Sequence, residues 1–162
     1  LEQIVVAGVA CDKSEARVHL VGVEDRPGVS ASIFEKIAAQ NICVDMIIQN
    51  IGQDGNTDMT FTVPKDDFAR AMTLSKKIAG SLGATEVLGD ESIVKVSVVG
   101  LGMARQTGVA EKMFRSLADA GINIEAITTS DPDGKGAFFE SPAGKNYRHA
   151  VYYTASEGVP HL

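Results

Sequence analysis

The chain is short of several features that would point to particular functions. Its 162 residues include no tryptophan, three tyrosines and six phenylalanines, so a hydrophobic core must be mainly aliphatic. Acidic residues outnumber basic ones, the formal net charge is −6, and the sequence contains no basic run. Because a nucleic-acid surface needs clustered lysine and arginine to displace phosphate counterions, this composition argues against nucleic-acid binding.

Cysteines and long apolar runs are also scarce. Cys11 and Cys43 are the only cysteines; they form no CxxC pair and have no histidine at ligand spacing, which indicates two reduced thiols and no metal site. No apolar run approaches the ~20 residues of a membrane span, and the first residues have neither a basic segment nor a long apolar one. We therefore expect a cytoplasmic protein without membrane contact, metal or cofactor.

Catalytic constellations are absent from the sequence as well. His19, His149 and His161 are scattered, and no phosphate-binding GxxxxGK[ST] motif occurs. The stretch 99–104, VGLGMA, lacks the third glycine of a dinucleotide-binding loop. The sequence thus favours a binding or regulatory module over an enzyme.

An internal repeat is the most informative feature that is present. When Gly28 is aligned with Gly108, an offset of 80, apolar residues coincide along the next 20 positions. The matched pairs are Val29 and Val109, Phe34 and Phe114, Ala38 and Ala118, Ile42 and Ile122, and Ile47 and Ile127. Upstream, residues 18–22 resemble residues 96–100. One supersecondary unit therefore occurs twice.

The first copy predicts the split βαββαβ order of a ferredoxin-like α+β fold. Alternation of apolar and polar residues predicts strands, and apolar residues at helical spacing predict helices. The elements expected in order are a strand at 18–23, a helix from Val29 to about Gln40, strands at 44–51 and 59–63 joined by a turn at 53–56, a helix over 68–82 ended by Gly83, and a strand at 85–88.

The second copy begins in the same way but ends differently. A strand at 94–100, a helix from Val109 capped by Gly121 and a strand at 122–129 are expected. Turn-rich residues then follow from Asp131, and one last strand is expected at 149–154, so this unit is one helix short. Residues 1–9 form a spare strand that we expect to complete the second unit. The predicted domains are 16–91 and 92–162, the latter completed by the N-terminal strand 1–10.

The loop before the first helix of each copy is the candidate binding site. Gly28 and Gly108 each precede a helix, whose first N–H groups are unpaired and attract a carboxylate or phosphate. Asp25 adds a carboxylate that could take an ammonium, so the first loop suits a free α-amino acid. Gln49 and Asn50 end one strand and Thr128, Thr129 and Ser130 its counterpart, where they could hydrogen-bond a ligand. Simple turn formation by Asp25 and ordinary strand-end capping are the alternatives.

Five segments together resemble the regulatory region of bacterial aspartokinases, a pair of ACT domains. They are VACDKSEA (9–16), VDMIIQN (44–50), TDMTFTV (57–63), KVSVVGLGM (95–103) and GINIEAITTS (121–130). The resemblance runs from about residue 3 to residue 130. It implies an enzyme that phosphorylates aspartate with ATP, which opens lysine, threonine and methionine synthesis. The kinase domain precedes the ACT pair in that family, and in some bacteria the pair alone is the β subunit of an α2β2 enzyme.

The resemblance also implies effector sites for lysine, threonine or both, placed between ACT units of two chains and used for allosteric feedback inhibition. The matching residues of the first unit are Asp25, Gly28, Val29, Ser30, Gln49 and Asn50. Thr57 matches a position where changes relieve feedback inhibition. The matching residues of the second unit are Gly108, Val109, Ala110, Asn123, Ile124, Thr128 and Thr129. From Asp131 onward the sequence departs from the family pattern.

Two other interpretations remain open at this point. The chain could be an ACT-type regulatory subunit of another amino-acid biosynthetic enzyme, such as acetohydroxyacid synthase, although residues 44–50 argue against it. An enzyme of the acylphosphatase kind would need an arginine and an asparagine over a phosphate loop, for which Arg105 and Asn123 are the candidates. In the leading interpretation the chain is a dimer, with itself or with the catalytic aspartokinase subunit.

Overall fold

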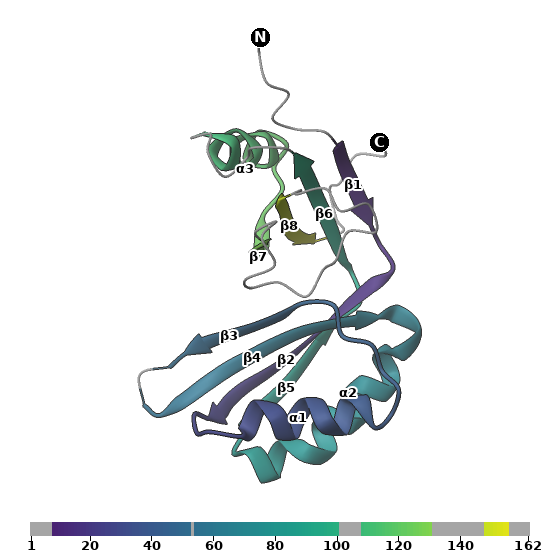
Figure 1. The fold of residues 1–162 in the computed structure, drawn as a ribbon, viewed down its shortest axis with the longest axis vertical. Coiled ribbons are helices and arrows are strands. Elements are labelled where there is room, and N and C mark those ends of the chain that lie inside the picture. Colours follow the sequence, from purple (N-terminus) through teal and green to yellow (C-terminus); the bar gives the residue numbers. More distant parts are fainter. Residues whose placement is uncertain (1–7, 53, 101–107, 131–147, 156–162) are drawn as a thin grey trace. The chain divides into compact units, whose positions relative to one another are not determined.

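The computed structural model describes residues 8–52, 54–100, 108–130 and 148–155. The chain divides into two compact units, Ser14–Glu91 and Leu1–Lys13 with Ser92–Leu162. Each unit contains a four-stranded sheet whose strand pairs are all antiparallel (Figure 1). The two units are described separately below.

The Ser14–Glu91 unit has the predicted βαββαβ order. Its elements are β2 (Glu15–Glu24), α1 (Val29–Ala38), β3 (Ile47–Ile51), β4 (Asn56–Pro64), α2 (Lys65–Ala79), the single-turn helix η1 (Gly80–Leu82) and β5 (Glu86–Asp90). The strands lie in the order β3-β4-β2-β5. The prediction of a ferredoxin-like α+β unit is confirmed, and Gly83 ends the second helical segment with a φ of 71°.

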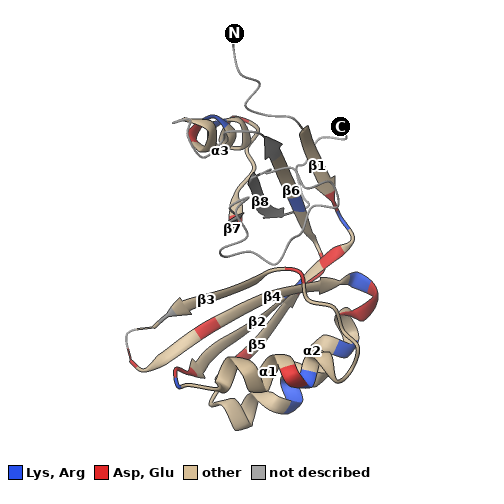
Figure 2. Ribbon diagram, in the orientation of Figure 1, with Lys and Arg blue, Asp and Glu red and all other residues tan. Residues whose placement is uncertain are grey.

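The core of this unit lies between one face of the sheet and both helices (Figure 1). Along α1, residues Val29, Ile33 and Ile37 recur every four positions and are buried. Alternate residues of β2 and β4 meet them, and Phe34 packs edge-to-face on Phe61 with ring centroids 5.7 Å apart. Lys and Arg are interspersed with Asp and Glu on the outer surfaces of the helices (Figure 2).

One strand of this unit is shorter than predicted. The prediction placed a strand at 44–51, whereas β3 begins at Ile47. Asp45 and Met46 both bond to Thr62: the Asp45 N–H donates to the Thr62 carbonyl (3.1 Å), and the Thr62 N–H donates to the Met46 carbonyl (3.0 Å). Two residues therefore face one, which interrupts the ladder before regular pairing starts.

The other unit is built from β6 (Ile93–Gly100), α3 (Val109–Asp119), β7 (Ile124–Ser130), β8 (Arg148–Ala155) and β1 (Gly8–Asp12). Its strands lie in the order β1-β6-β8-β7, so β1 takes the place that β5 has in the first unit. The described part of this unit contains no second helix. Val98 is buried against Val96, Met113, Phe114 and Ile124.

The N-terminal strand pairs with β6, in the unit that was expected to receive it, from Gly8 opposite Val99 to Asp12 opposite Lys95. Its described part runs three residues past the end of the predicted strand at 1–9, to Asp12. Residues 1–7 are outside the described part, as is the turn-rich stretch from Asp131 to 147. Among the described residues, no helix is long and apolar enough to cross a membrane.

Candidate functional site

The loop between β2 and α1 leads to an open helix N-terminus. Gly28 is the N-cap residue, with a φ of 92° and no side-chain capping bond. A Cβ atom added at Gly28 would meet no heavy atom within 4 Å, so the space beside this residue is open. The left-handed φ explains why glycine stands here. The Gly28 carbonyl accepts the Ser32 N–H at 2.9 Å, which starts the helix.

The start of helix α3 in the second unit has the same geometry as the start of α1. Gly108 is the N-cap of α3 with a φ of 89°, no side-chain capping bond and no atom within 4 Å of an added Cβ. Its carbonyl accepts the Lys112 N–H at 3.0 Å. The repeat in the sequence is thus a repeat of the helix start, including the unusual glycine conformation.

The first loop presents donors and one carboxylate. Val29 is less available than predicted, since its N–H donates to the Arg26 carbonyl (3.3 Å) and its side chain is buried. The N–H groups of Ser30 and Ala31 belong to the same first turn, where no intrahelical acceptor exists. Asp25 is exposed, and its own N–H donates to the Gly55 carbonyl at 2.9 Å.

Strand β3 contributes Gln49 to this site. The Ser30 hydroxyl donates to Oε1 of Gln49 at 3.2 Å, so the start of α1 and the edge strand β3 meet here. Gln49 lies opposite Met59 and faces the helices, whereas Asn50 lies opposite Asp58 on the other face. The structure therefore brings Ser30 at the start of α1 together with Gln49, whereas the side chain of Asn50 lies on the other face; Asp25 is exposed in the same loop as Gly28.

Thr57 lies beneath the site rather than on its surface. Only 2% of the residue is exposed, and its hydroxyl donates to the Asn50 carbonyl across the β3–β4 hairpin. Thr57 thus fixes the backbone next to Gln49 and does not itself face solvent.

Fewer residues of the second site can be placed. Val109 is half-buried, Ala110 and Asn123 are exposed, and Ile124 opens β7. Thr128 and Thr129 lie within β7, where their backbones pair with Val151 and Ala150 of β8. Arg105 and the rest of the loop 101–107 lie outside the described residues, so the pairing of Arg105 with Asn123 that an acylphosphatase would need stays untested.

Two contacts around the first loop were not foreseen from the sequence. The Gly22 N–H donates to Oδ1 of Asp58 at 2.9 Å, and the Asp25 N–H donates to Gly55 as described above. An isolated glycine inside an alternating strand is a signal for a bulge, so Gly22 could have been noticed. Its partner could not, because Asp58 is 36 residues away.

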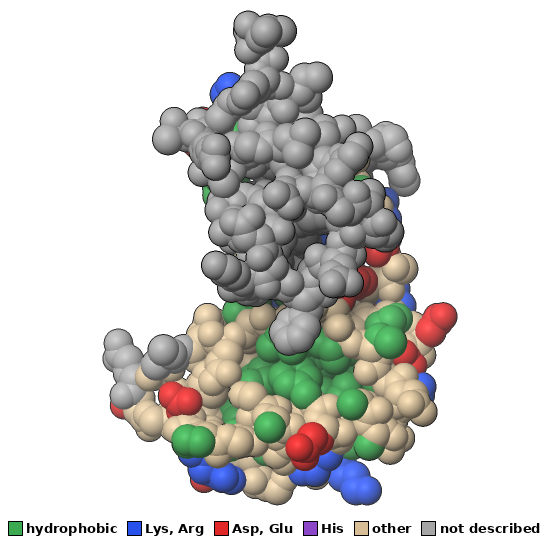
Figure 3. All heavy atoms as spheres, in the orientation of Figure 1, with side chains coloured by type: hydrophobic (Ala, Val, Ile, Leu, Met, Phe, Trp, Pro, Cys, Tyr) green, Lys and Arg blue, Asp and Glu red, His purple; other side chains and the backbone are tan. Residues whose placement is uncertain are grey.

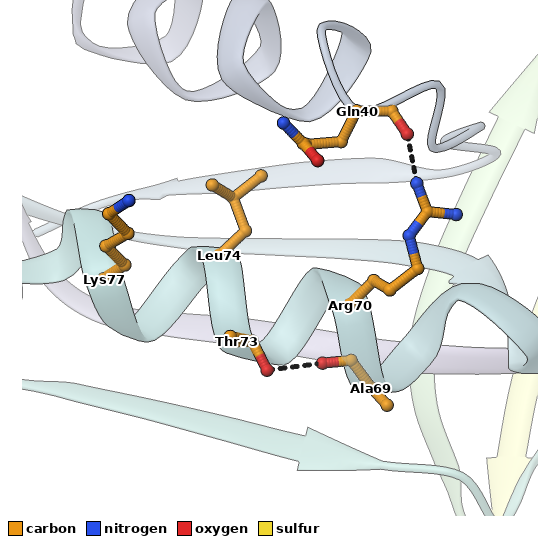
Figure 4. A pocket seen from close by; sticks show the side chains of 6 residues that line it. All are labelled: Gln40, Ala69, Arg70, Thr73, Leu74 and Lys77. Atoms are coloured by element: carbon orange, nitrogen blue, oxygen red, sulfur yellow. Dashed lines mark hydrogen bonds between the residues drawn. The ribbon is translucent and has the colours of Figure 1, made fainter.

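Apolar side chains gather in the middle of one face of the Ser14–Glu91 unit (Figure 3). A separate open groove of about 430 Å³ runs along α2 near the end of α1 (Figure 4). It is lined by Gln40, Ala69, Arg70, Thr73, Leu74 and Lys77. Arg70 already forms an ion pair with Asp67 at 2.7 Å and a hydrogen bond to the Gln40 carbonyl, and no predicted site residue lines the groove.

Within the described ranges, no group of three acidic, histidine or cysteine side chains could hold a metal.

Comparison with known proteins agrees with the fold. A family model described as the ACT domain matches residues 18–77 and 96–133. The aspartokinase of Pseudomonas aeruginosa is 45% identical over 131 residues, which are 81% of this chain and 32% of that protein. The aspartokinase of Corynebacterium glutamicum is 44% identical, with the same two shares.

Solved structures show the same relationship over nearly the whole chain. The ligand-free regulatory subunit of aspartate kinase from Thermus thermophilus is 35% identical with a TM-score of 0.77, over 94% of this chain and 90% of that one. A structure of aspartokinase alpha and beta subunits is 38% identical with a TM-score of 0.75, over 94% and 89% of the two chains.

The chain is therefore a member of the ACT-domain family, built from two such units. Within that family it corresponds to the regulatory part of aspartokinases and not to their catalytic domain, since it spans about a third of the curated relatives and nearly all of the regulatory subunit.

Proposed function

We propose that this chain senses an amino acid for an aspartate kinase and relays feedback inhibition. The effector is threonine, lysine or both, and the regulated reaction is aspartate phosphorylation, the first step of lysine, threonine and methionine synthesis. The observation that carries the proposal is the open, left-handed glycine N-cap at Gly28, which stands beside the exposed carboxylate of Asp25.

The chemistry of the first loop suits a zwitterion. The α-carboxylate would accept the N–H groups of Ser30 and Ala31 and lie at the positive end of α1. The α-ammonium would lie against Asp25. Gln49 stands next to Ser30 and is placed to hydrogen-bond a polar ligand side chain, and Thr57 holds the strand that carries it.

Regulation then requires a second conformation or a second chain. A bound amino acid favours one arrangement of the subunits only by its higher affinity for that arrangement. The coupling is reciprocal, so conditions that favour the inhibited arrangement must also tighten effector binding. The partner is a second copy or a catalytic aspartokinase subunit; the relative solved with alpha and beta subunits supports the latter.

Calorimetric titration of the chain with threonine, lysine and other amino acids tests the proposal. Asp25→Ala should weaken binding by about 1–3 kcal/mol, the cost of removing a charge-assisted hydrogen bond, which corresponds to roughly 5- to 150-fold in Kd. Glu35→Ala removes an exposed carboxylate further along α1 and is the matched control. We expect the control to bind like the parent.

Two results would contradict the proposal in different ways. Equal affinity of the parent and Asp25→Ala would show that the effector lies elsewhere. If neither threonine nor lysine binds the parent at millimolar concentration, the chain does not sense these amino acids.

A further inference from the structure

The strand that leads into the candidate loop contains one irregularity. Leu20 pairs with Met59 and Val23 pairs with Thr57, so two residues of β2 lie opposite the single residue Asp58. This is a β-bulge, which adds a residue to one strand and changes the direction of the chain beyond it. The second of these two residues, Gly22, has a φ of 69°, a conformation that favours glycine.

Hydrogen bonds on both sides of β2 hold the bulge in place. On one side the carboxylate of Asp58 accepts the Gly22 N–H at 2.9 Å, which replaces a ladder bond that the extra residue would otherwise lose. On the other side the Val21 carbonyl accepts the Thr85 N–H at 2.8 Å and the Thr85 hydroxyl at 3.3 Å. A Cβ added at Gly22 would lie 3.0 Å from the Thr85 hydroxyl oxygen, so a side chain would also be crowded there.

The bulge decides which way the loop faces. Side chains of a regular strand alternate between its faces, so residues three apart point in opposite directions. Leu20 and Val23 are three apart, yet both are fully buried in the same core. Without the extra residue, Val23 would point away from the helices and Glu24 would point into the core. The bulge therefore determines which side chains face the core at the end of β2, and so how the chain enters the loop that contains Asp25 and Gly28.

In the described part of the second unit, strand β6 has no such bulge. It pairs with β8 without a shift, from Ile93 opposite Ala155 to Gly100 opposite Arg148.

We propose that Asp58 is a positioning residue of the first effector site. Asp58 does not contact the effector. Its hydrogen bond with the Gly22 N–H stabilises the bulge, and the bulge orients Asp25 and the start of α1 toward the ligand. This inference rests on the proposed function of the loop.

The test uses three variants of the whole chain. Asp58→Ala removes the acceptor, Asp58→Asn keeps an oxygen acceptor of the same shape, and Asp54→Ala removes a nearby exposed carboxylate in the hairpin as a control. Backbone amide NMR without ligand reports the loop itself. Calorimetry with threonine and with lysine reports the site.

Asp58→Ala should move the amide resonances of residues 22–30, increase hydrogen exchange at Gly22 and weaken effector binding by at least about tenfold. Asp58→Asn should restore the resonances and bring the affinity to within about threefold of the parent, and the control should change neither. Restoration by Asp58→Asn separates positioning from a general loss of stability.

The inference is wrong if Asp58→Ala leaves the loop resonances and the affinity unchanged, or if Asp58→Asn is as damaging as Asp58→Ala. If the parent binds no effector, the proposed function fails on its own. The ligand-free NMR comparison then shows whether Asp58 still sets the loop, so the two failures are distinguishable.

Discussion

Thr57 shows how a buried hydroxyl can control a binding surface that it does not reach. Its hydroxyl donates to the Asn50 carbonyl on the neighbouring strand, and its side chain sits on the core face of β4. The adjoining residue Gln49 carries the carboxamide that meets Ser30. A substitution at Thr57 should therefore move β3, and it should affect the site only through that movement.

Thr57→Ile should weaken effector binding while the fold persists. The substitution removes the hydroxyl that donates to Asn50 and adds apolar volume at a packed position, which costs about 1–3 kcal/mol of stability. Chemical denaturation measures that cost and calorimetry measures the affinity. Thr57→Ser keeps the hydroxyl and should bind within a few-fold of the parent. Equal affinity of Thr57→Ile and the parent would remove Thr57 from the supporting structure of the site.

The candidate site was predictable where local chemistry determines it. Gly28 and Asp25 are next to a helix start and could be chosen from turn signals alone. Asn50 was paired with Gln49 in the prediction, but strand register sends their side chains to opposite faces. The bond between Gly22 and Asp58 depends on register over 36 residues, which no local pattern encodes.

At the level of whole elements, the internal repeat predicted more than propensity could. It gave the order of elements in both units and identified the spare N-terminal strand. It ended that strand too early, since β1 runs to Asp12 and not to residue 9. Apolar residues continue through both stretches, so composition could not fix the register, which pairing with β6 determines.

Removal of residues 1–12 should destabilise the second unit and spare the first. Strand β1 covers one edge of β6, and its loss exposes that edge to solvent. Amide hydrogen exchange should then rise at Val96 and Val98 of β6 and stay unchanged at Leu20 and Met59 of the other sheet. Uniform loss of protection in both sheets would show that the two units do not unfold independently.

At the level of the whole molecule, each described sheet ends in an edge strand that is paired on one side only. β3 and β7 are the outer strands on the side away from β5 and β1, respectively, and they are equivalent in the repeat. Each carries a large exposed isoleucine, Ile47 with 52% and Ile127 with 48% of its surface accessible. An exposed apolar edge strand can pair with a strand of another chain, so we expect a partner to cover it.

We expect the chain to form a dimer at micromolar concentration, and effector binding to strengthen it. Ile47→Lys places a charge on the β3 edge and should shift the mass measured by light scattering toward the monomer, because a buried unpaired lysine opposes association. Leu88→Lys, at the opposite edge of the same sheet, is the control, since Leu88 is similarly exposed at 45%. Dissociation by Leu88→Lys and not by Ile47→Lys would assign the interface to β5. A parent that stays monomeric with and without threonine would mean that a second copy is not the partner.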